Sequence, residues 1–151
     1  MITRRLSLSS INKTAPYQVW TENGYTFLFR TGDGVTYEIG FVEDCMISDD
    51  GDVSQLIISV VNGDASHRDS KIQDTVTAIL EEYFKTDYAT LVYICDTNDG
   101  RQSFRQRLFS IWFHSYSEKD RFFHEYKELI IDGIGYYMAI LSRKDNPLLP
   151  D

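Results

Sequence analysis

The stretch from Ser54 to Cys95 constrains the fold more than any other part of the sequence. Two apolar runs, SQLIISVVNG and ATLVYIC, flank SKIQDTVTAILEEYF, whose apolar residues recur at the spacing of an amphipathic helix. The first run is apolar on consecutive residues, which is typical of a strand covered on both faces. Strands joined through a helix usually pair in parallel. The sequence therefore predicts a parallel strand pair at the centre of a sheet, with a crossover helix.

Hairpin turns are predicted in the chain before this unit. Three β-rich runs cover residues 17–20, 25–30 and 35–43, and Asn23-Gly24 and Asp33-Gly34 lie between them. Such dipeptides favour tight turns because glycine adopts positive φ without a steric penalty. In the third run apolar residues alternate with Thr, Glu and Gly, as in a strand with one buried face. An antiparallel meander is therefore expected here.

The chain after Cys95 is predicted to add a helix and a hairpin. Residues 101–116 carry apolar side chains at helical spacing, and Asp132-Gly133 separates two apolar runs. Residues 118–128 fit either a strand or a helix. We therefore expect an α+β fold with a mixed, mostly antiparallel sheet of about seven strands and two main helices, in the order β-β-β-β-α-β-α-β-β. Residues 1–151 should form a single domain, with an N-terminal segment at 1–15 and a frayed tail at 146–151.

Composition limits the partners of the chain. Hydrophobic residues make up 42% of it and aromatic residues 14%, which is enough for one core. The net charge of -8 disfavours nucleic acid, because phosphates repel an acidic surface. No apolar run has the length of a membrane span or signal peptide, and the two cysteines are expected to be reduced. We expect a cytoplasmic protein with a protein partner and no membrane or nucleic-acid binding. The oligomeric state stays open.

Cys95 and Arg101 are separated by five residues, between a predicted strand and a predicted helix, which is the layout of a cysteine phosphatase loop. In such a loop, backbone N–H groups and the arginine hold phosphate and stabilise the thiolate nucleophile. Here the intervening residues are DTNDG, and their two carboxylates would repel phosphate and raise the pKa of the thiol. A buried cysteine at a strand end is the favoured alternative. The phosphatase is the weakest of the three functional hypotheses for this chain; the other two, an interaction module and an acyltransferase, follow below.

Other charged residues give weaker candidates. Arg101, Arg105 and Arg107 lie on the predicted second helix, where they form either a solvated face or a contact for an anion or an acidic partner. The histidines have no partners at metal-ligand spacing, and the acidic loop SDDGD lacks the ordered positions of a calcium loop. No metal site is predicted.

The order of elements from Val35 onward resembles the later two thirds of the GNAT acyltransferase superfamily. There, the strand before the central helix ends in an Arg-Gly-x-Gly-x-Gly loop that holds the pyrophosphate of acyl-CoA. The matching residues here are RDSKIQ, from Arg68 to Gln73, which lack the glycines. A tyrosine that often serves as general acid in the superfamily would fall near Phe109, which has no proton to donate. Both departures argue against ordinary acetyl transfer.

The GNAT resemblance implies a specific set of site residues. Arg68, Ser70 and Lys71 would contact the pyrophosphate of acyl-CoA, and Glu43 would act as the base. A splayed cleft between the strands near Val60 and Tyr93 would favour this hypothesis.

A second resemblance is to a small bacterial family described only as a domain of unknown function. It rests on YICDTNDGRQ, RLFSIWF and the terminal RKDNP, and it implies a bacterial origin and no particular activity. We therefore favour a non-catalytic protein-interaction module without a cofactor. The alternative is a divergent acyl-CoA-dependent acyltransferase.

Overall fold

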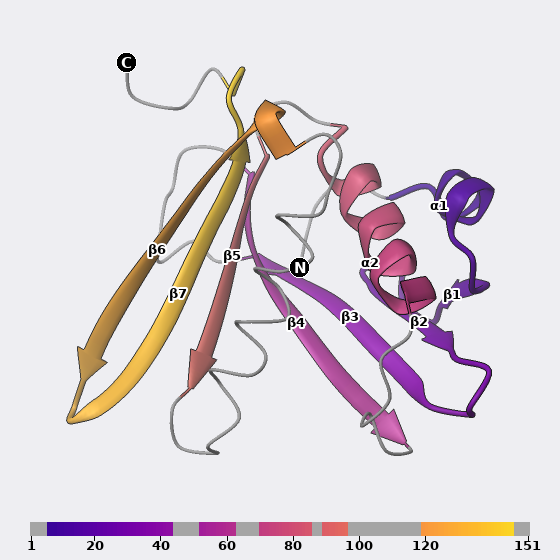
Figure 1. The fold of residues 1–151 in the computed structure, drawn as a ribbon, viewed down its shortest axis with the longest axis horizontal. Coiled ribbons are helices and arrows are strands. Elements are labelled where there is room, and N and C mark those ends of the chain that lie inside the picture. Colours follow the sequence, from indigo (N-terminus) through magenta and orange to yellow (C-terminus); the bar gives the residue numbers. More distant parts are fainter. Residues whose placement is uncertain (1–5, 44–51, 63–69, 86–88, 97–118, 147–151) are drawn as a thin grey trace.

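The computed structural model describes residues 6–43, 52–62, 70–85, 89–96 and 119–146 (Figure 1). Within these ranges, seven strands form one sheet in the order β1-β2-β3-β4-β5-β7-β6. Two α-helices, α1 (Leu8–Thr14) and α2 (Ser70–Tyr83), and the short 3-10 helix η1 (Lys119–Arg121) accompany the sheet. The strands are β1 (Val19–Thr21), β2 (Thr26–Arg30), β3 (Thr36–Glu43), β4 (Asp52–Asn62), β5 (Ala89–Asp96), β6 (Phe122–Ile131) and β7 (Ile134–Arg143).

Strand directions confirm the predicted mixed sheet. β4 and β5 pair in parallel across the α2 connection, and every other neighbouring pair of described strands is antiparallel. The stretch that fitted both a strand and a helix forms η1 and the start of β6. The α+β class and the mixed, mostly antiparallel sheet of seven strands are therefore confirmed within the described residues. The predicted second helix, residues 101–116, lies outside them.

The closing hairpin between β6 and β7 is also confirmed. Ile131 pairs with Ile134, so that Asp132 and Gly133 form a two-residue turn. Both turn residues have positive φ, 53° at Asp132 and 81° at Gly133. Aspartate followed by glycine suits this backbone because both residues tolerate the left-handed region.

The main core lies between α2 and one face of the sheet. Ile72, Val76 and Ile79 of α2 are buried in it. The ring of Tyr83 stacks on that of Phe41, with 4.8 Å between centroids, and its hydroxyl donates a hydrogen bond to a strand carbonyl, as a buried phenol requires. The amphipathic pattern that predicted α2 is thus explained by its contact with the sheet.

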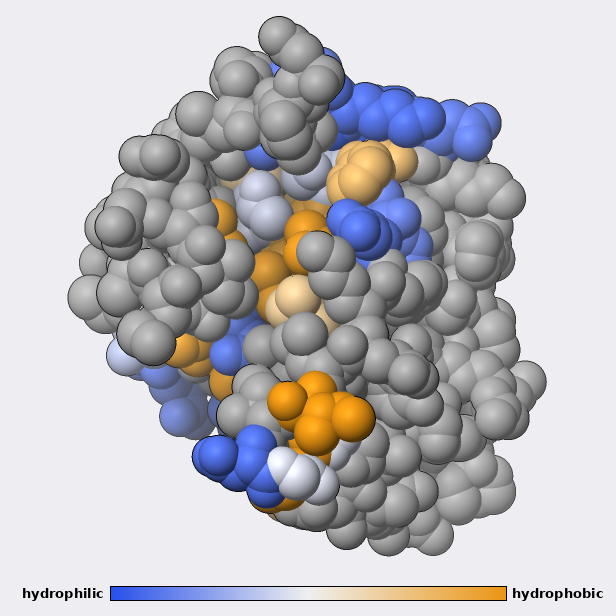
Figure 2. All heavy atoms as spheres, turned by 90° about the vertical axis from the view of Figure 1, so that its left-hand side faces the viewer, coloured by the Kyte–Doolittle hydropathy of each residue, from blue (hydrophilic) through white to orange (hydrophobic). Residues whose placement is uncertain are grey.

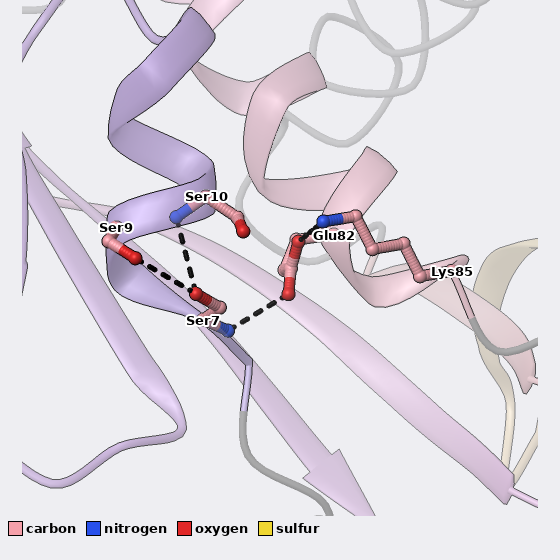
Figure 3. Close-up of polar contacts among 5 residues, drawn as sticks. All are labelled: Ser7, Ser9, Ser10, Glu82 and Lys85. Atoms are coloured by element: carbon pink, nitrogen blue, oxygen red, sulfur yellow. Dashed lines mark hydrogen bonds and ion pairs between the residues drawn. The ribbon is translucent and has the colours of Figure 1, made fainter.

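Helix α1 was not predicted, and it lies in the stretch expected to be an N-terminal segment. Its seven residues are too few to show a clear helical period. Ser7 caps it, because its side-chain oxygen accepts a hydrogen bond from the Ser10 N–H at 3.2 Å. Glu82 Oε1 accepts another from the Ser7 N–H at 3.0 Å, and Glu82 Oε2 lies 2.6 Å from Lys85 Nζ (Figure 3). The buried carboxylate of Glu82 therefore joins the start of α1 to the end of α2.

The outer edge of β1 is closed by a side chain. Asn12 of α1 accepts a hydrogen bond from the Val19 N–H at 2.8 Å and donates one to the Val19 carbonyl at 2.9 Å. The amide of Asn12 thus takes the place that a neighbouring strand would occupy. The N–H and carbonyl groups of Val19 on this edge are therefore not available to pair with another strand. Covering an edge in this way is one means by which proteins protect edge strands.

Candidate binding edge on β4

Strand β4 extends beyond its pairing with β5. The parallel ladder ends at the pair of Leu56 and Tyr93. Beyond it, β4 continues along β3 to Asn62, whereas β5 continues along β7 to Asp96, and the two strands diverge (Figure 1). The edge of β4 from Ile57 to Asn62 that faces away from β3 therefore has no strand partner among the described residues.

This free edge carries backbone hydrogen-bonding groups. Alternate residues of a strand direct their N–H and C=O groups to the same side. The segment from Ile57 to Asn62 therefore presents the groups of about three residues toward the gap between β4 and β5. An extended chain could pair with them.

Three apolar side chains along the free edge are exposed. Ile57, Val60 and Val61 expose 42%, 41% and 53% of their surface. The prediction that this run is covered on both faces is right for Ser54 and Leu56, which are buried, and wrong for Ile57, Val60 and Val61. Consecutive apolar residues indicate burial only where neighbours continue on both sides, and here the ladder with β5 stops first.

Ser70 and Lys71 form the first turn of α2, and both are exposed. Lys71 Nζ lies 5.9 Å from the centroid of the Tyr17 ring, which is a cation–π distance. Thr75 Oγ1 donates to the Lys71 carbonyl at 2.6 Å and accepts from the Tyr17 N–H at 3.3 Å. The structure thus places the two predicted pyrophosphate contacts together, with the ammonium of Lys71 beside an aromatic ring. Arg68, the third, lies outside the described residues.

The two predicted catalytic candidates do not meet. Glu43 is the last residue of β3. It pairs with Ser54 of β4, which in turn pairs with Leu91 of β5. Cys95 lies four residues further along β5, roughly 13 Å away along the strand, opposite Tyr137 of β7. The backbone register therefore gives them no shared site.

The remaining candidates cannot be placed. Arg101, Arg105 and Arg107 lie outside the described residues. Within the described ranges, no group of three His, Cys, Asp or Glu side chains could hold a metal ion. No helix in the described part of the chain has both the length and the apolar character needed to cross a membrane.

The sequence predicted neither the edge of β1 that Asn12 protects nor the free edge at the end of β4. Asn12 gave no signal, because an asparagine in a short polar segment is usually a turn residue. The exposed end of β4 could be recognised only once the length of the β4–β5 ladder was known.

A comparison with family models places the second half of the chain. Residues 68–151, more than half of the sequence, match a family of unknown function, DUF6169. The chain belongs to this family. Its DUF6169 region contains α2, β5, η1, β6 and β7, whereas α1 and β1 to β4 precede it. No curated protein and no solved structure matches the chain. The predicted resemblance to a domain of unknown function is thereby confirmed.

Proposed function

We propose that this chain is a non-catalytic protein-interaction module that captures an extended segment of a partner protein along the free edge of β4. The observation that carries the proposal is the end of the β4–β5 ladder at Leu56, with β4 continuing to Asn62. Addition of a strand to such an edge is a common mode of peptide recognition.

The partner segment would be held by two kinds of contact. Its main chain would pair with the N–H and C=O groups of β4, which supplies affinity with little dependence on sequence. Ile57, Val60 and Val61, all exposed, would contact its apolar side chains. The net charge of -8 favours a segment whose other side chains are neutral or basic.

A strand-addition site also explains why apolar residues of β4 are exposed at an unpaired edge. Exposed β-branched residues at an unpaired edge favour aggregation unless the edge is protected or used. The β1 edge is protected by Asn12, whereas the described residues provide no such device beside Ile57 to Asn62. Departures from the usual burial rules are most often found where a protein binds something.

The proposal is tested by crosslinking and then by peptide chemistry. A photoreactive amino acid at Val61 should label a partner segment in cells, while the same group at exposed Glu22, at the far end of the sheet, should not label it. A synthetic copy of the labelled segment should then bind with micromolar affinity or better.

Backbone methylation of that peptide distinguishes strand addition from simple apolar contact. N-methyl groups on alternate residues should abolish binding, because those N–H groups donate to β4, and N-methyl groups on the intervening residues should be tolerated. Equal tolerance at every position would refute strand addition, as would labelling at Val61 and Glu22 alike.

A second candidate function is a divergent acyl-CoA-dependent acyltransferase. The divergence of β4 and β5 beyond Tyr93 and the exposed first turn of α2, with Ser70 and Lys71, are the observations in its favour. Helix N-termini attract phosphate groups. The missing glycines and the acidic net charge count against it.

Thermal unfolding with CoA and acetyl-CoA separates the two functions. A ligand at about a hundred times its Kd adds roughly 2.7 kcal/mol, which raises the Tm of a domain of this size by about 5 to 10 °C. We expect no rise. A rise that is lost in Arg68→Ala and Lys71→Ala would favour the transferase over the interaction module.

A further inference from the structure

The backbone groups that β4 turns toward the gap belong to particular residues. On β3, the Phe41 N–H donates to the Tyr25 carbonyl at 3.2 Å, on the β2 side and away from β4. Phe41 pairs with Leu56, so the backbone groups of Leu56 point away from β3 as well. Because a strand alternates, Ile58 and Val60 also turn their N–H and C=O groups away from β3. These two residues carry the backbone groups with which a captured segment would pair.

A β-bulge sets the length of this free edge. Asn62 pairs with Thr36, and Val60 pairs with the next residue of β3, so Val61 is an extra residue in β4. The Thr36 N–H donates to the side chain of Asn62 at 3.1 Å. The regular edge therefore ends at Val60. A captured segment would pair regularly along three residues, beginning at Ile58.

We propose that the captured segment carries apolar side chains opposite Ile58 and Val60, with a lysine or arginine between them that pairs with Glu38. This inference rests on the proposed strand addition and adds the chemistry of the segment. The pattern of apolar, basic and apolar residues reads the same in both directions, so it holds for a parallel and for an antiparallel segment.

The two apolar positions follow from the core face of the sheet. Val60 pairs with Tyr37, and Tyr37 pairs with Phe29. The rings of Phe29 and Tyr37 stack with 5.4 Å between their centroids, and Val60 at the end of this row is 41% exposed. Ile58 packs against the same core. Apolar side chains opposite Val60 and Ile58 would extend these rows, as aromatic and β-branched pairs do across neighbouring strands.

The basic position follows from the other face of the sheet. The residue between the two apolar positions would lie beside Ser59, which pairs with Glu38. Glu38 is half-buried, and its carboxylate makes no hydrogen bond or ion pair within the part of the chain that the structure describes. The captured residue and Glu38 would be two strand spacings apart, about 10 Å. Ser59 is small and exposed, so a long cationic side chain can pass over it to the carboxylate.

Peptide selection on the full chain tests this chemistry. A phage-displayed library of randomised short peptides should yield sequences with a lysine or arginine between two apolar residues. Selection on Glu38→Lys should yield an aspartate or glutamate at the central position, and Glu38→Gln should remove the preference for charge. Glu22→Lys reverses an exposed charge at the far end of the sheet and should keep the native preference.

A synthetic copy of a selected peptide makes the test quantitative. Exchange of its central lysine for glutamate should raise the Kd for the native chain about five- to tenfold and lower the Kd for Glu38→Lys.

Val60→Asp and Ile130→Asp form a matched pair for the apolar positions. Val60→Asp should abolish binding of the selected peptide, because it places a charge beside the apolar row. Ile130 is 80% exposed and lies next to the β6–β7 turn. Figure 2 looks onto the β6 side of the molecule and shows a hydrophobic patch toward its lower end, near this turn. Ile130→Asp should therefore leave binding unchanged. Far-ultraviolet circular dichroism checks that each variant is folded.

N-methylation of alternate residues in the selected peptide separates the two possible failures. Peptides that need these N–H groups but have no basic centre, or whose central charge is the same for the native chain and both Glu38 variants, would overturn this inference and leave strand addition intact. Peptides that bind equally well whichever N–H groups are methylated, or a library without any binder that depends on Val60, would overturn both.

Discussion

Single polar residues hold the helical layer of this molecule together, and Glu82 illustrates how. Its carboxylate is mostly buried, accepts the Ser7 N–H and contacts Lys85, whose side chain is 61% exposed (Figure 3). Glu82→Ala should lower the free energy of unfolding by about 1 to 3 kcal/mol, because it leaves a partly buried N–H without its acceptor. Lys85→Ala should cost less than about 1 kcal/mol, since an exposed ion pair contributes little. Urea denaturation measures both. An equal loss in the two variants would contradict this division.

Arg143 acts at the residue scale near the end of β7. Its guanidinium donates to the Phe84 carbonyl at 3.2 Å and, through Nε and Nη2, to both oxygens of the Asp145 carboxylate. These hydrogen bonds are the main reason why the pKa of Asp145 lies below its ordinary value. A carboxylate with a lowered pKa in the folded state stabilises the fold above its ordinary pKa, and this contribution is lost as the pH falls through the lowered value.

The pH prediction concerns Asp145 directly. Arg143→Gln should raise the pKa of Asp145 toward its ordinary value, as followed by a carboxyl NMR titration. Lys144→Gln removes a neighbouring exposed charge but none of these hydrogen bonds, and it should change the titration much less. A pKa of Asp145 that does not move in Arg143→Gln would show that its cause lies elsewhere.

At the scale of elements, the end of the sheet depends on α1. Asn12→Ala removes both hydrogen bonds to Val19 and should lower the free energy of unfolding by about 1 to 3 kcal/mol. Asn12→Asp keeps the acceptor but loses the donor, so its effect should differ from that of the alanine. Lys13→Ala, an exposed position on the same helix, should stay within about 0.5 kcal/mol of the native chain. If the edge is protected by Asn12, the alanine variant should also aggregate faster at high concentration.

Elements with a strong local signal were predicted well. α2, the β4–β5 parallel pair and the Asp132-Gly133 hairpin follow from periodicity and turn chemistry, which the chain encodes within a few residues. α1 was missed because its stability comes from Ser7, Asn12 and contacts with α2 rather than from its own period. The candidate site could not be predicted from sequence, because the free edge of β4 depends on where a neighbouring strand turns away.

At the scale of the whole molecule, the sheet has two parts joined over a short length. β1 to β4 form one part and β5 to β7 the other, and the parallel ladder between them ends at Leu56 and Tyr93. The DUF6169 region begins at residue 68, just before α2, and includes α2 and the whole second part. Yet Tyr83 of α2 stacks on Phe41 of the first part, and the core residues of both parts form one cluster. Packing therefore favours a single folding unit that extends beyond the family match.

Hydrogen exchange on a core variant tests this unity. Leu56 is 1% exposed and belongs to the last pair of the ladder, so Leu56→Ala should lower the free energy of unfolding by about 2 to 5 kcal/mol. In one cooperative unit, the free energy of exchange of the slowest-exchanging amides should fall by the same amount in β3 and in β7, because both sets exchange only through global unfolding. Ile57→Ala, at the exposed neighbouring position, should change the exchange free energies of the β3 and β7 amides much less. If only the β3 amides lost protection in Leu56→Ala, the two parts would unfold separately, and the DUF6169 region would be a domain in its own right.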